Sequence, residues 1–414
     1  MHQAHQHALK IAVIGGSITG CTMAIELAGL GCDVTLFERG GEELKDRGAG
    51  IGIPPSVMAA YVGRGLIAPD VPCFEAHNFV RRWRTAAEPE YGYLAWKQPV
   101  NMVMLNWGML YRNLRERVPA GIYRTRTRVT ALRGMPSQVE LDLENGQTLR
   151  FDLVVCADGY ASLGRKALFP TLDIHYAGYV LWRGSLPESA LNESQPLESG
   201  VHALGYPGGH GIFYFVPGLE GSTARGQRIV NWAMYVPVPD LAGFMIDRDG
   251  RAHDGSLPPG AMPDATEARL KAEAQTRLPD YYARIAVASQ RTYVYAIYDC
   301  EVPAYRQHRI CLAGDAGAFA RPHSGAGALK GVNDAIALRT ALEANADLET
   351  ALLHWNIGQT ESGNNMVRFG NQLGRALVQE IPDWSTMNAT EMERWFTACV
   401  TINTEMFGAS KRHA

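Results

Sequence analysis

Hydrophobic and polar positions at the start of the chain predict a strand, a helix and a second strand. The apolar run Lys10–Gly15 has the length of a buried strand. Apolar residues recur at helical spacing through Ile18–Leu30, and Val34–Glu38 is a second apolar run that ends in an acid. This order predicts a parallel strand–helix–strand unit.

Farther along, the pattern predicts short elements between turn signals. Residues 41–55, GEELKDRGAGIGIPP, are rich in glycine and proline and are interpreted as a loop. The next expected elements are a strand at 102–105, a helix at 107–117 and three β-runs within 124–157. A hairpin turn at Glu144-Asn145-Gly146 should join the last two runs.

The pattern of hydrophobic and polar positions in residues 176–289 differs from that of the preceding residues. Aromatic residues alternate in YVLWRG, GIFYFVPG and IVNWAMYVPV, which predicts antiparallel strands of a second sheet. ICLAGD, at 310–315, resembles the first unit again, and helices are expected at 329–344, 348–380 and 387–407. The expected fold class is α/β, with a Rossmann-like nucleotide-binding domain interrupted by a β-rich domain and followed by C-terminal helices.

These changes divide the chain into six expected segments. The nucleotide-binding domain takes residues 1–77, 101–175 and 297–380. The β-rich domain takes 78–100 and 176–296, and a C-terminal helix takes 381–414.

Composition narrows the class of protein. The 414 residues are 46% hydrophobic and 20% charged with a net charge of −3, so no nucleic-acid-binding surface is expected. No apolar run approaches a membrane span, and the polar N-terminus does not resemble a signal peptide. The seven cysteines are dispersed without a C-x-x-C pair, which favours reduced thiols in a cytoplasmic protein. No metal site is expected.

The turn after the first strand is a candidate dinucleotide site. Gly15 permits a tight turn, Gly20 lets the helix pack closely on the strand, and the helix N-terminus attracts a pyrophosphate. Ser17 replaces the middle glycine of the usual motif but is small enough for the backbone to approach phosphates. Glu38 ends the second strand, where it can accept hydrogen bonds from a ribose. Ordinary α/β packing is the alternative interpretation.

Two further motifs lie in CADGYASLGR, residues 156–165, and in AGDAGAFARPHSGAGALKGVNDAIAL, residues 313–338. With GGSITG near the N-terminus, they resemble the three fingerprints of the flavoprotein aromatic hydroxylases. These are single-component FAD monooxygenases with the p-hydroxybenzoate hydroxylase fold. The resemblance covers the chain except its last helix. The chain departs from many members at Ala318, where they carry histidine.

The resemblance implies FAD as the tightly held nucleotide and NADH or NADPH as a transient co-substrate. Asp315 would accept hydrogen bonds from the ribitol, Arg112 would donate to the pyrophosphate, and Asp158, supported by Arg165, would serve both nucleotides. A solvated arginine and an ordinary turn are the alternatives at Arg112 and Asp158. The implied cofactor-binding residues are Gly15, Ser17, Ile18, Thr19, Glu38, Arg39, Arg47, Arg112, Val129, Asp158, Asp315, Pro322, Gly325, Ala326, Gly327 and Ala328.

Other flavoprotein classes fit the sequence less well. There is no second strand–GxGxxG–helix unit, which disfavours Baeyer–Villiger oxygenases and disulfide reductases. The reductases also need a redox cysteine pair. The W-x-W-x-I-P stretch of flavin halogenases is missing.

The substrate is expected between the β-rich domain and the flavin, because domain interfaces favour pockets. His323, His210 and Tyr214 are the catalytic candidates, since a neutral histidine could take a proton from a ring hydroxyl. A histidine that only shapes its loop is the alternative. Further aromatic candidates for the pocket, most of which would be core in an ordinary sheet, are Tyr179, Trp182, Trp232 and Tyr235.

The sequence therefore predicts an FAD-dependent monooxygenase that hydroxylates a hydroxylated aromatic or N-heteroaromatic ring with NAD(P)H and O2, through a C4a-hydroperoxyflavin. GGSITG, YAGYVLWRG, SLPPG and RPH look most like family members that hydroxylate dihydroxypyridines, so a hydroxypyridine is the first choice and a phenol the second. Two alternatives stay open: a flavin oxidase or dehydrogenase without oxygen insertion, and a non-catalytic FAD-binding sensor. The expected partners are the small aromatic substrate and O2, without nucleic acid or membrane. A homodimer is compatible with the sequence.

Overall fold

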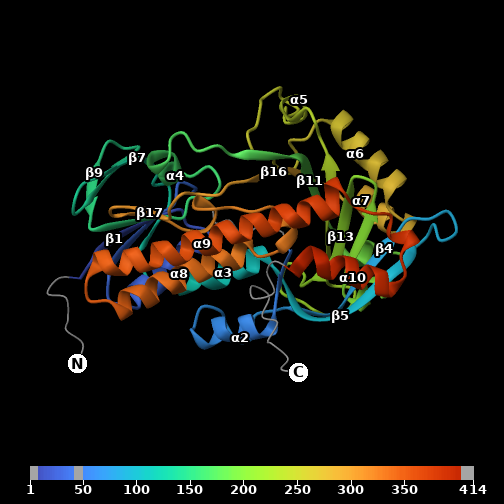
Figure 1. Ribbon diagram of the computed structural model, residues 1–414, viewed down its shortest axis with the longest axis horizontal. Coiled ribbons are helices and arrows are strands. Elements are labelled where there is room, and N and C mark those ends of the chain that lie inside the picture. Colours follow the sequence, from blue (N-terminus) through green and yellow to red (C-terminus); the bar gives the residue numbers. More distant parts are fainter. Residues whose placement is uncertain (1–7, 42–49, 402–414) are drawn as a thin grey trace.

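The computed structural model describes residues 8–41 and 50–401, which form two large sheets, a small third sheet and the helices around them. In Figure 1 the six-stranded sheet lies on the left and the nine-stranded sheet on the right. Helix α9 (Leu348–Gly374) runs across both halves.

The six-stranded sheet is the centre of the nucleotide-binding part. Its strand β1 is apolar and buried after its first residue, and it pairs in parallel on both sides, which places it in the middle. Only the pair β17–β18 is antiparallel. In spatial order the strands are β17 (Arg306–Gln307), β18 (Ile310–Leu312), β10 (Leu153–Cys156), β1 (Lys10–Ile14), β2 (Asp33–Phe37) and β6 (Tyr123–Arg124).

The last β-run predicted before residue 157 is in fact two strands of different sheets. β9 (Thr148–Phe151) completes an antiparallel sheet with β7 (Val129–Gly134) and β8 (Val139–Leu143), whereas β10 enters the parallel sheet. Between them Asp152 accepts a hydrogen bond from the backbone of Lys10 at 2.8 Å. The predicted hairpin joins β8 to β9, with Gly146 at φ 83°.

The nine-stranded sheet mixes strands from distant parts of the chain. β12 pairs in parallel with β4, which lies between two pieces of the nucleotide-binding part, and β3 closes the far edge. In spatial order the strands are β15 (Ser256–Leu257), β16 (Tyr293–Asp299), β11 (His175–Pro187), β14 (Ile229–Pro237), β13 (Gly209–Val216), β12 (Val201–Tyr206), β4 (Phe74–Trp83), β5 (Tyr93–Asn106) and β3 (Gly50–Ile53).

The loop predicted over residues 41–55 is wrong at its end. Gly50–Ile53 is strand β3, which pairs antiparallel with β5, and α2 (Pro55–Gly63) begins at the second proline. The glycine-rich segment has little intrinsic preference for strand structure. Its hydrogen bonds to β5 stabilise the strand instead. The first half of that loop, residues 42–49, lies outside the described residues.

Two helices inside the β-rich part were not predicted. α6 (Asp264–Arg277) and α7 (Asp280–Ala288) each follow a proline, and they pack on one face of the nine-stranded sheet over Trp182 and Trp232. A proline directly before a helix is a start signal that the sequence did contain.

The remaining helices surround these sheets. α1 packs between α3 and α8, and the C-terminal turn of α9 continues as a π-helix, Arg375–Gln379. α10 was expected to extend to residue 407, which is outside the described residues. Their bounds are α1 (Ile18–Ala28), α3 (Trp107–Arg117), α4 (Leu163–Leu168), α5 (Leu241–Phe244), α8 (Gly327–Ala344) and α10 (Ala389–Val400), with short 3-10 turns at Glu188–Ala190, Gln195–Ser199, Gly314–Ala316, Pro322–Ser324 and Trp384–Thr386.

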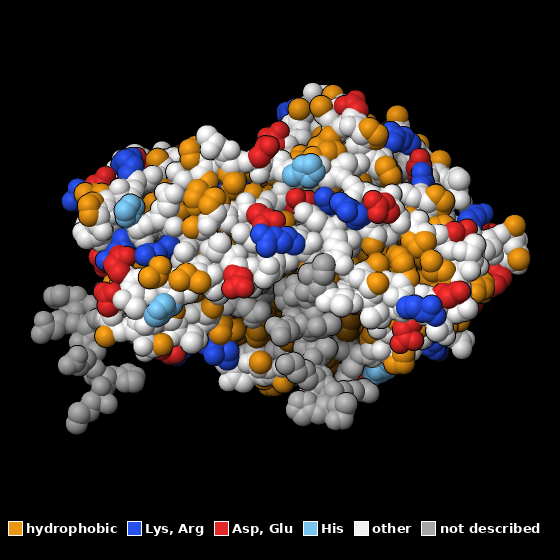
Figure 2. All heavy atoms as spheres, viewed as in Figure 1, with side chains coloured by type: hydrophobic (Ala, Val, Ile, Leu, Met, Phe, Trp, Pro, Cys, Tyr) orange, Lys and Arg blue, Asp and Glu red, His pale blue; other side chains and the backbone are white. Residues whose placement is uncertain are grey.

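Figure 2 shows lysine and arginine side chains interspersed with acidic ones on the visible face, without one large patch of a single sign. Among the helices of the described residues, none is long and apolar enough to cross a membrane.

Candidate functional site

The first motif forms a turn that only glycine can make. Gly15 has φ +100°, and a Cβ on it would lie 2.4 Å from the carbonyl oxygen of Ala157. A Cβ on Gly20 would lie 1.8 Å from the carbonyl oxygen of Gly15. The side chain of Ser17 does not cap α1, and the first turn of α1 has no acid. The N-terminal amides of α1 are therefore available to a phosphate.

Glu38 holds this turn against the end of β2. Its carboxylate accepts hydrogen bonds from the backbone of Gly16 at 2.8 Å and of Gly40 at 2.7 Å. A contact between Glu38 and a ribose stays a prediction. Of the neighbouring predicted residues, Arg39 is exposed and Val129 is half-buried at the start of β7.

Thr19 joins the first motif to the third. Added Cβ atoms on Gly314 and Gly331 would lie 2.5 Å and 1.9 Å from the Thr19 hydroxyl, so this side chain packs against both backbones. Ile18 is 3% exposed, which leaves only its backbone for a cofactor.

Arg165 joins the second motif to the third. Its guanidinium donates to the carbonyls of Asp315 at 2.8 Å and Ala316 at 3.1 Å, and also to the carbonyl of Tyr160. The guanidinium lies over the ring of Phe319. The three sequence motifs thus meet at one edge of the six-stranded sheet.

Asp158 assists the N-cap residue of α4, Ser162, with one carboxylate oxygen and keeps the other oxygen unused. Oδ2 accepts from the backbone of Leu163 at 2.7 Å, whereas the buried Oδ1 has no hydrogen-bond partner in the described part of the chain. Burial raises the pKa of Asp158 above its ordinary value. An unpaired buried acceptor is the kind of atom that a bound ligand satisfies.

Asp315 is open to solvent although the residues on either side of it are buried. Desolvation by surrounding protein raises the pKa of Asp315, while Lys330 and Arg165 oppose the shift. Lys330 donates to the carbonyl of Gly314 at 3.0 Å and to Asp334 at 2.7 Å. This buried pair fixes the turn that carries Asp315.

The third motif ends in an open backbone cradle. Gly325 has φ +66° after the turn Pro322–Ser324, and a Cβ on Gly325 or Gly327 would meet nothing within 4 Å. Ala326 is the N-cap of α8, without a side-chain cap, and Ala328 is half-buried in the first turn. A flat ring can lie against this backbone, with the positive end of α8 toward it. The residues present therefore fit FAD.

Of the two arginines predicted to bind the cofactor through a long side chain, the structure describes only Arg112. Arg112 is half-buried on α3 and makes one long hydrogen bond, 3.5 Å, to the carbonyl of Leu219. Arg47 lies outside the described residues.

His323 lies where the third motif meets the nine-stranded sheet. Its ring stacks on Tyr235 with centroids 4.2 Å apart, and its Nε2 is 2.9 Å from the hydroxyl of Tyr179. Its Nδ1 is buried and has no hydrogen-bond partner within residues 8–41 and 50–401. Burial, followed by the charges of His210 and Arg321, lowers the pKa of His323 well below its usual range.

His210 lies beside His323, with the two ring centroids 5.4 Å apart, and it also contacts Tyr235. The rings of His210 and Tyr235 stack at 4.6 Å, and the Nδ1 of His210 donates to the carbonyl of Leu377 at 3.2 Å. That carbonyl belongs to the π-helical turn of α9, a distortion that is frequent beside functional sites. Burial lowers the pKa of His210 to about 4, so both histidines are neutral at pH 7.

The other aromatic candidates divide between the two faces of the sheet. Tyr179, Tyr214 and Tyr235 share the face of His210, because side chains alternate along strands. Trp182 and Trp232 lie on the opposite face under α6 and α7, so the prediction that they line the pocket is wrong. Sequence reasoning missed polar residues on the first face, which are Arg183, Asn231 and Arg321.

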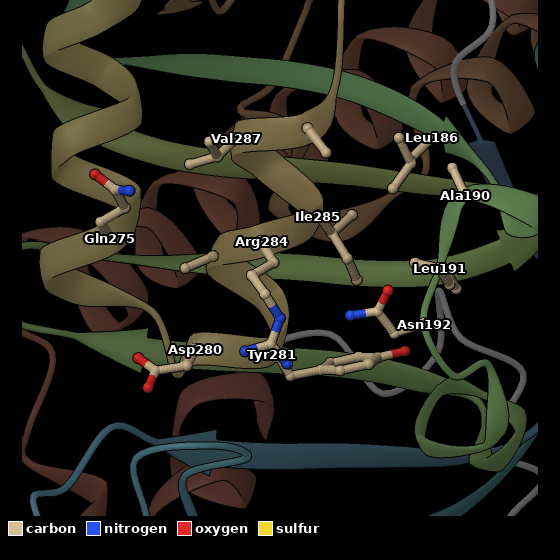
Figure 3. Close-up of a pocket in the computed structure, with 12 residues that line it drawn as sticks. Leu186, Ala190, Leu191, Asn192, Gln275, Asp280, Tyr281, Arg284, Ile285 and Val287 are labelled. Carbon is tan, nitrogen blue, oxygen red and sulfur yellow. The ribbon is translucent and has the colours of Figure 1, made fainter.

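A separate groove of about 610 Å³ lies on the opposite face, beside α7. Figure 3 shows Leu186, Tyr281, Arg284 and Ile285 around it. None of the predicted site residues lines it.

Comparisons with known proteins agree with this geometry. A family model described as FAD binding domain-like matches residues 176–299, and one described as pyridine nucleotide-disulphide oxidoreductase matches residues 10–51. The chain is 28% identical over 370 residues to 2,6-dihydroxypyridine 3-monooxygenase from Paenarthrobacter nicotinovorans, which covers 86% of this chain and 88% of that protein. The solved structure of 2,6-dihydroxypyridine-3-hydroxylase from Arthrobacter nicotinovorans matches with a TM-score of 0.81 and 25% identity, covering 90% of this chain and 93% of that one. These matches show an FAD-dependent aromatic hydroxylase.

This hydroxylase is also 26% identical over 360 residues to salicylate hydroxylase from Pseudomonas putida, covering 82% of this chain and 78% of that protein. It uses FAD, with NADH or NADPH as co-substrate. The match to the disulphide oxidoreductases is confined to the first strand–helix–strand unit, and the cysteines of the described residues are free.

Proposed function

We propose that this hydroxylase acts on a hydroxypyridine, or failing that a phenol, whose ring hydroxyl lies against Nδ1 of His323. The observation that carries the proposal is the stacking of His323 on Tyr235 with a buried, unpaired Nδ1. The relatives named above act on a dihydroxypyridine and on salicylate, which are both hydroxylated rings.

Tyr179 sets the position of the His323 proton. Burial raises the pKa of Tyr179 to about 12, so its hydroxyl keeps its proton at neutral pH. Arg321 can only donate, and its guanidinium lies 3.5 Å from the Tyr179 oxygen, which leaves the hydroxyl hydrogen for Nε2 of His323. Neutral His323 then carries its own proton on Nδ1.

With its proton on Nδ1, His323 donates a hydrogen bond to a ring oxygen rather than removing a proton from it. This role replaces the general base expected from the sequence, because the lowered pKa makes the imidazole a weak base. A donor at this point stabilises the ionised ring hydroxyl, which enriches the carbons ortho and para to it. Bound FAD, reduced by NADH or NADPH, supplies the oxygen chemistry. The sheet and the Pro322–Ser324 turn orient the ring and exclude water.

The reaction is tested with purified holoenzyme, NADH or NADPH, isotopically labelled O2, and a panel of hydroxypyridines and phenols. We expect at least one ring to stimulate NAD(P)H oxidation and to gain one labelled oxygen atom. Turnover of a ring without label in the product would instead support an oxidase. Failure of every ring to stimulate NAD(P)H oxidation would contradict the substrate class.

The role of His323 is tested by comparing His323→Asn with His323→Ala. Asparagine places an N–H near the position of Nδ1 but cannot accept a proton there. His323→Ala should lower the hydroxylation rate roughly 10²-fold at neutral pH, while His323→Asn should retain much more activity. Raising the pH should partly restore the alanine variant, because the ring then ionises unaided. Equal losses in both variants would favour a general base.

A further inference from the structure

A buried ion pair lies close to His323 in the sequence and in space. The guanidinium of Arg321 donates from Nε to Asp299 at 2.7 Å, and both side chains are less than a tenth exposed. Asp299 ends β16, and Arg321 is the N-cap of the turn that carries His323. Backbone hydrogen bonds between Cys300 and Phe319 already join these two segments. Because burying two charges costs desolvation free energy, attachment of the turn does not account for the ion pair.

The guanidinium also faces Tyr179. Nη1 of Arg321 lies 3.5 Å from the hydroxyl oxygen of Tyr179, and that oxygen lies 2.9 Å from Nε2 of His323. A chain of polar contacts therefore runs from the end of β16 to the imidazole. A tyrosine oxygen that accepts from a cation becomes a stronger donor, which favours a lone pair rather than a proton on Nε2.

Helix α9 leaves room for this chain at one position. A Cβ on Gly374, the last residue of α9, would lie 2.5 Å from the Tyr179 hydroxyl and 2.9 Å from both Cδ and Nη1 of Arg321. One turn earlier, a Cβ on Gly370 would lie 3.1 Å from the backbone nitrogen of Arg321. A Cβ on Gly358, in the middle of the same helix, would meet nothing within 4 Å. The close approach is thus specific to the end of α9 that meets Tyr179 and Arg321.

The other titratable groups around His323 are neutral at pH 7. Burial raises the pKa values of Tyr179 on β11 and Tyr235 on β14, so both keep their protons. Burial lowers the pKa of His210 on β13 to about 4. Burial also lowers the pKa of His323, and the charges of His210 and Arg321 lower it further. Arg321 is therefore the cation of this cluster at neutral pH.

We propose that Asp299 and Arg321 are positioning residues of the hydroxylase, which hold the Tyr179 hydroxyl as a donor and thereby keep the proton of His323 on Nδ1. Asp299 fixes the guanidinium, the guanidinium orients the hydroxyl, and the hydroxyl leaves the Nδ1–H of His323 to the ring oxygen. The catalytic consequence rests on the proposed function. The position of the proton is a property of the protein without substrate, so it can be measured separately.

The position of the proton is measured by NMR of holoenzyme whose histidines carry nitrogen-15. Nitrogen chemical shifts distinguish an N–H from a lone pair, and the His323 signals are those that His323→Asn lacks. We expect Nδ1–H in the wild type at pH 7. The double variant Asp299→Asn/Arg321→Gln replaces the charged pair with two amides and leaves no unpaired charge. It should move much of the proton to Nε2, the nitrogen that carries the proton in most free neutral imidazole side chains.

A single methyl group on α9 tests the same chain without altering a charge. Gly374→Ala places a Cβ against the Tyr179 hydroxyl, so it should move the proton in the same direction and lower the hydroxylation rate roughly tenfold. Gly358→Ala, at the open position of the helix, should keep the wild-type rate and NMR signals. In a Tyr179→Phe background, the double variant should lower the rate little further, because residues that act through one group are not additive.

A wild-type proton on Nε2 would overturn the inference, as would an unmoved proton in the double variant. Fully additive losses with Tyr179→Phe would also overturn it, since the ion pair would then act without the hydroxyl. If the melting temperature and flavin absorbance show that the double variant is unfolded, Gly374→Ala is compared in its place, and an unmoved proton there has the same meaning. A proton that stays on Nδ1 only with the ion pair intact, without hydroxylation of any ring, would keep the inference and contradict the proposed function.

Discussion

Asp315 is exposed between two buried neighbours, and this places a charged acceptor where the three motifs meet. We predict that Asp315→Ala lowers the affinity for FAD roughly tenfold to a hundredfold, because hydrogen bonds to a charged group contribute about 1.5–3 kcal/mol. Titration of apoprotein with FAD, followed by flavin fluorescence, measures the change. Asp70→Ala, at an exposed position away from the motifs, should bind FAD normally. Equal affinities in the two variants would remove Asp315 from the cofactor site.

One carboxylate oxygen of Asp158 accepts a hydrogen bond from Leu163, and the other has no partner among the described residues. Two substitutions can therefore separate a role in stability from a role in flavin reduction. Asp158→Ala should lower stability by about 1 kcal/mol through loss of the hydrogen bond to Leu163 in the first turn of α4, and it should also slow reduction of FAD. Asp158→Asn keeps an acceptor for Leu163, so it should restore stability but not the rate. Anaerobic stopped-flow measurement of flavin reduction by NADH and NADPH gives the rates. Normal reduction in both variants would leave Asp158 with the role in stability alone.

At the residue scale, the motifs predicted the glycines and acids that meet at one edge of the six-stranded sheet, but not the polar residues on the Tyr235 face of the nine-stranded sheet. Gly15 and Gly325 can be found because their positive φ angles restrict the residue type. Arg183 and Asn231 carry no such local signal, and only the pairing of β11 with β14 brings them to one face. Alternation along YVLWRG separates Arg183 from Trp182, but it does not say which face meets the flavin.

At the element scale, helix α8 anchors the turn that carries Asp315. Lys330 and Asp334 on α8 bind the carbonyl and the amide of Gly314, and both are buried. We predict that Lys330→Met destabilises the protein by about 3–5 kcal/mol, because Asp334 is left as a buried charge without its partner. FAD affinity should fall as well, since the turn loses a hydrogen bond.

Urea denaturation measures this loss, with Lys271→Met as the matched control. Lys271 forms an ion pair with Glu267 at the same spacing, 2.9 Å long, but on the solvent side of α6. That pair should contribute less than about 1 kcal/mol. Similar losses in the two variants would show that burial does not distinguish them.

Elements with a strong local pattern were predicted well. The helix Trp107–Arg117 agrees with its prediction, and β1 and α1 agree apart from their ends. β3 was missed because its strand structure comes from pairing with β5 rather than from its glycine-rich sequence. α6 and α7 were missed because the surrounding aromatic runs suggested strands throughout.

At the scale of the whole molecule, three buried neutral histidines make stability depend on pH. Burial lowers the pKa of His202 to about 3 and of His210 to about 4, and it lowers that of His323 well below its usual range. Below pH 6.5 the unfolded chain binds protons on these residues while the native state does not, so stability falls as the pH decreases. At pH 5, each of these histidines should lower the free energy of unfolding by about 2 kcal/mol.

Urea midpoints between pH 7.5 and pH 5 test this prediction, with the histidine variants as comparison. His202→Asn, which is remote from the ring site and contacts Ser199 and Tyr282, should reduce the slope of stability against pH. An unchanged slope would mean that His202 takes up a proton without unfolding. Loss of stability toward acid pH is then due to carboxylates instead.

The parallel pairing of β12 with β4 has a consequence for how the chain folds during synthesis. Val201 pairs with Phe79, and β1 pairs with β10, which follows it by well over a hundred residues. The first strand therefore leaves the ribosome with its neighbour β2 long before its other neighbour, β10, exists, and pairings of such high sequence separation form slowly. β1, which is apolar and buried after its first residue, is paired on only one side until β10 has been made. Until then the nascent chain exposes an apolar strand edge, which is a site where unfinished chains can pair with one another and aggregate.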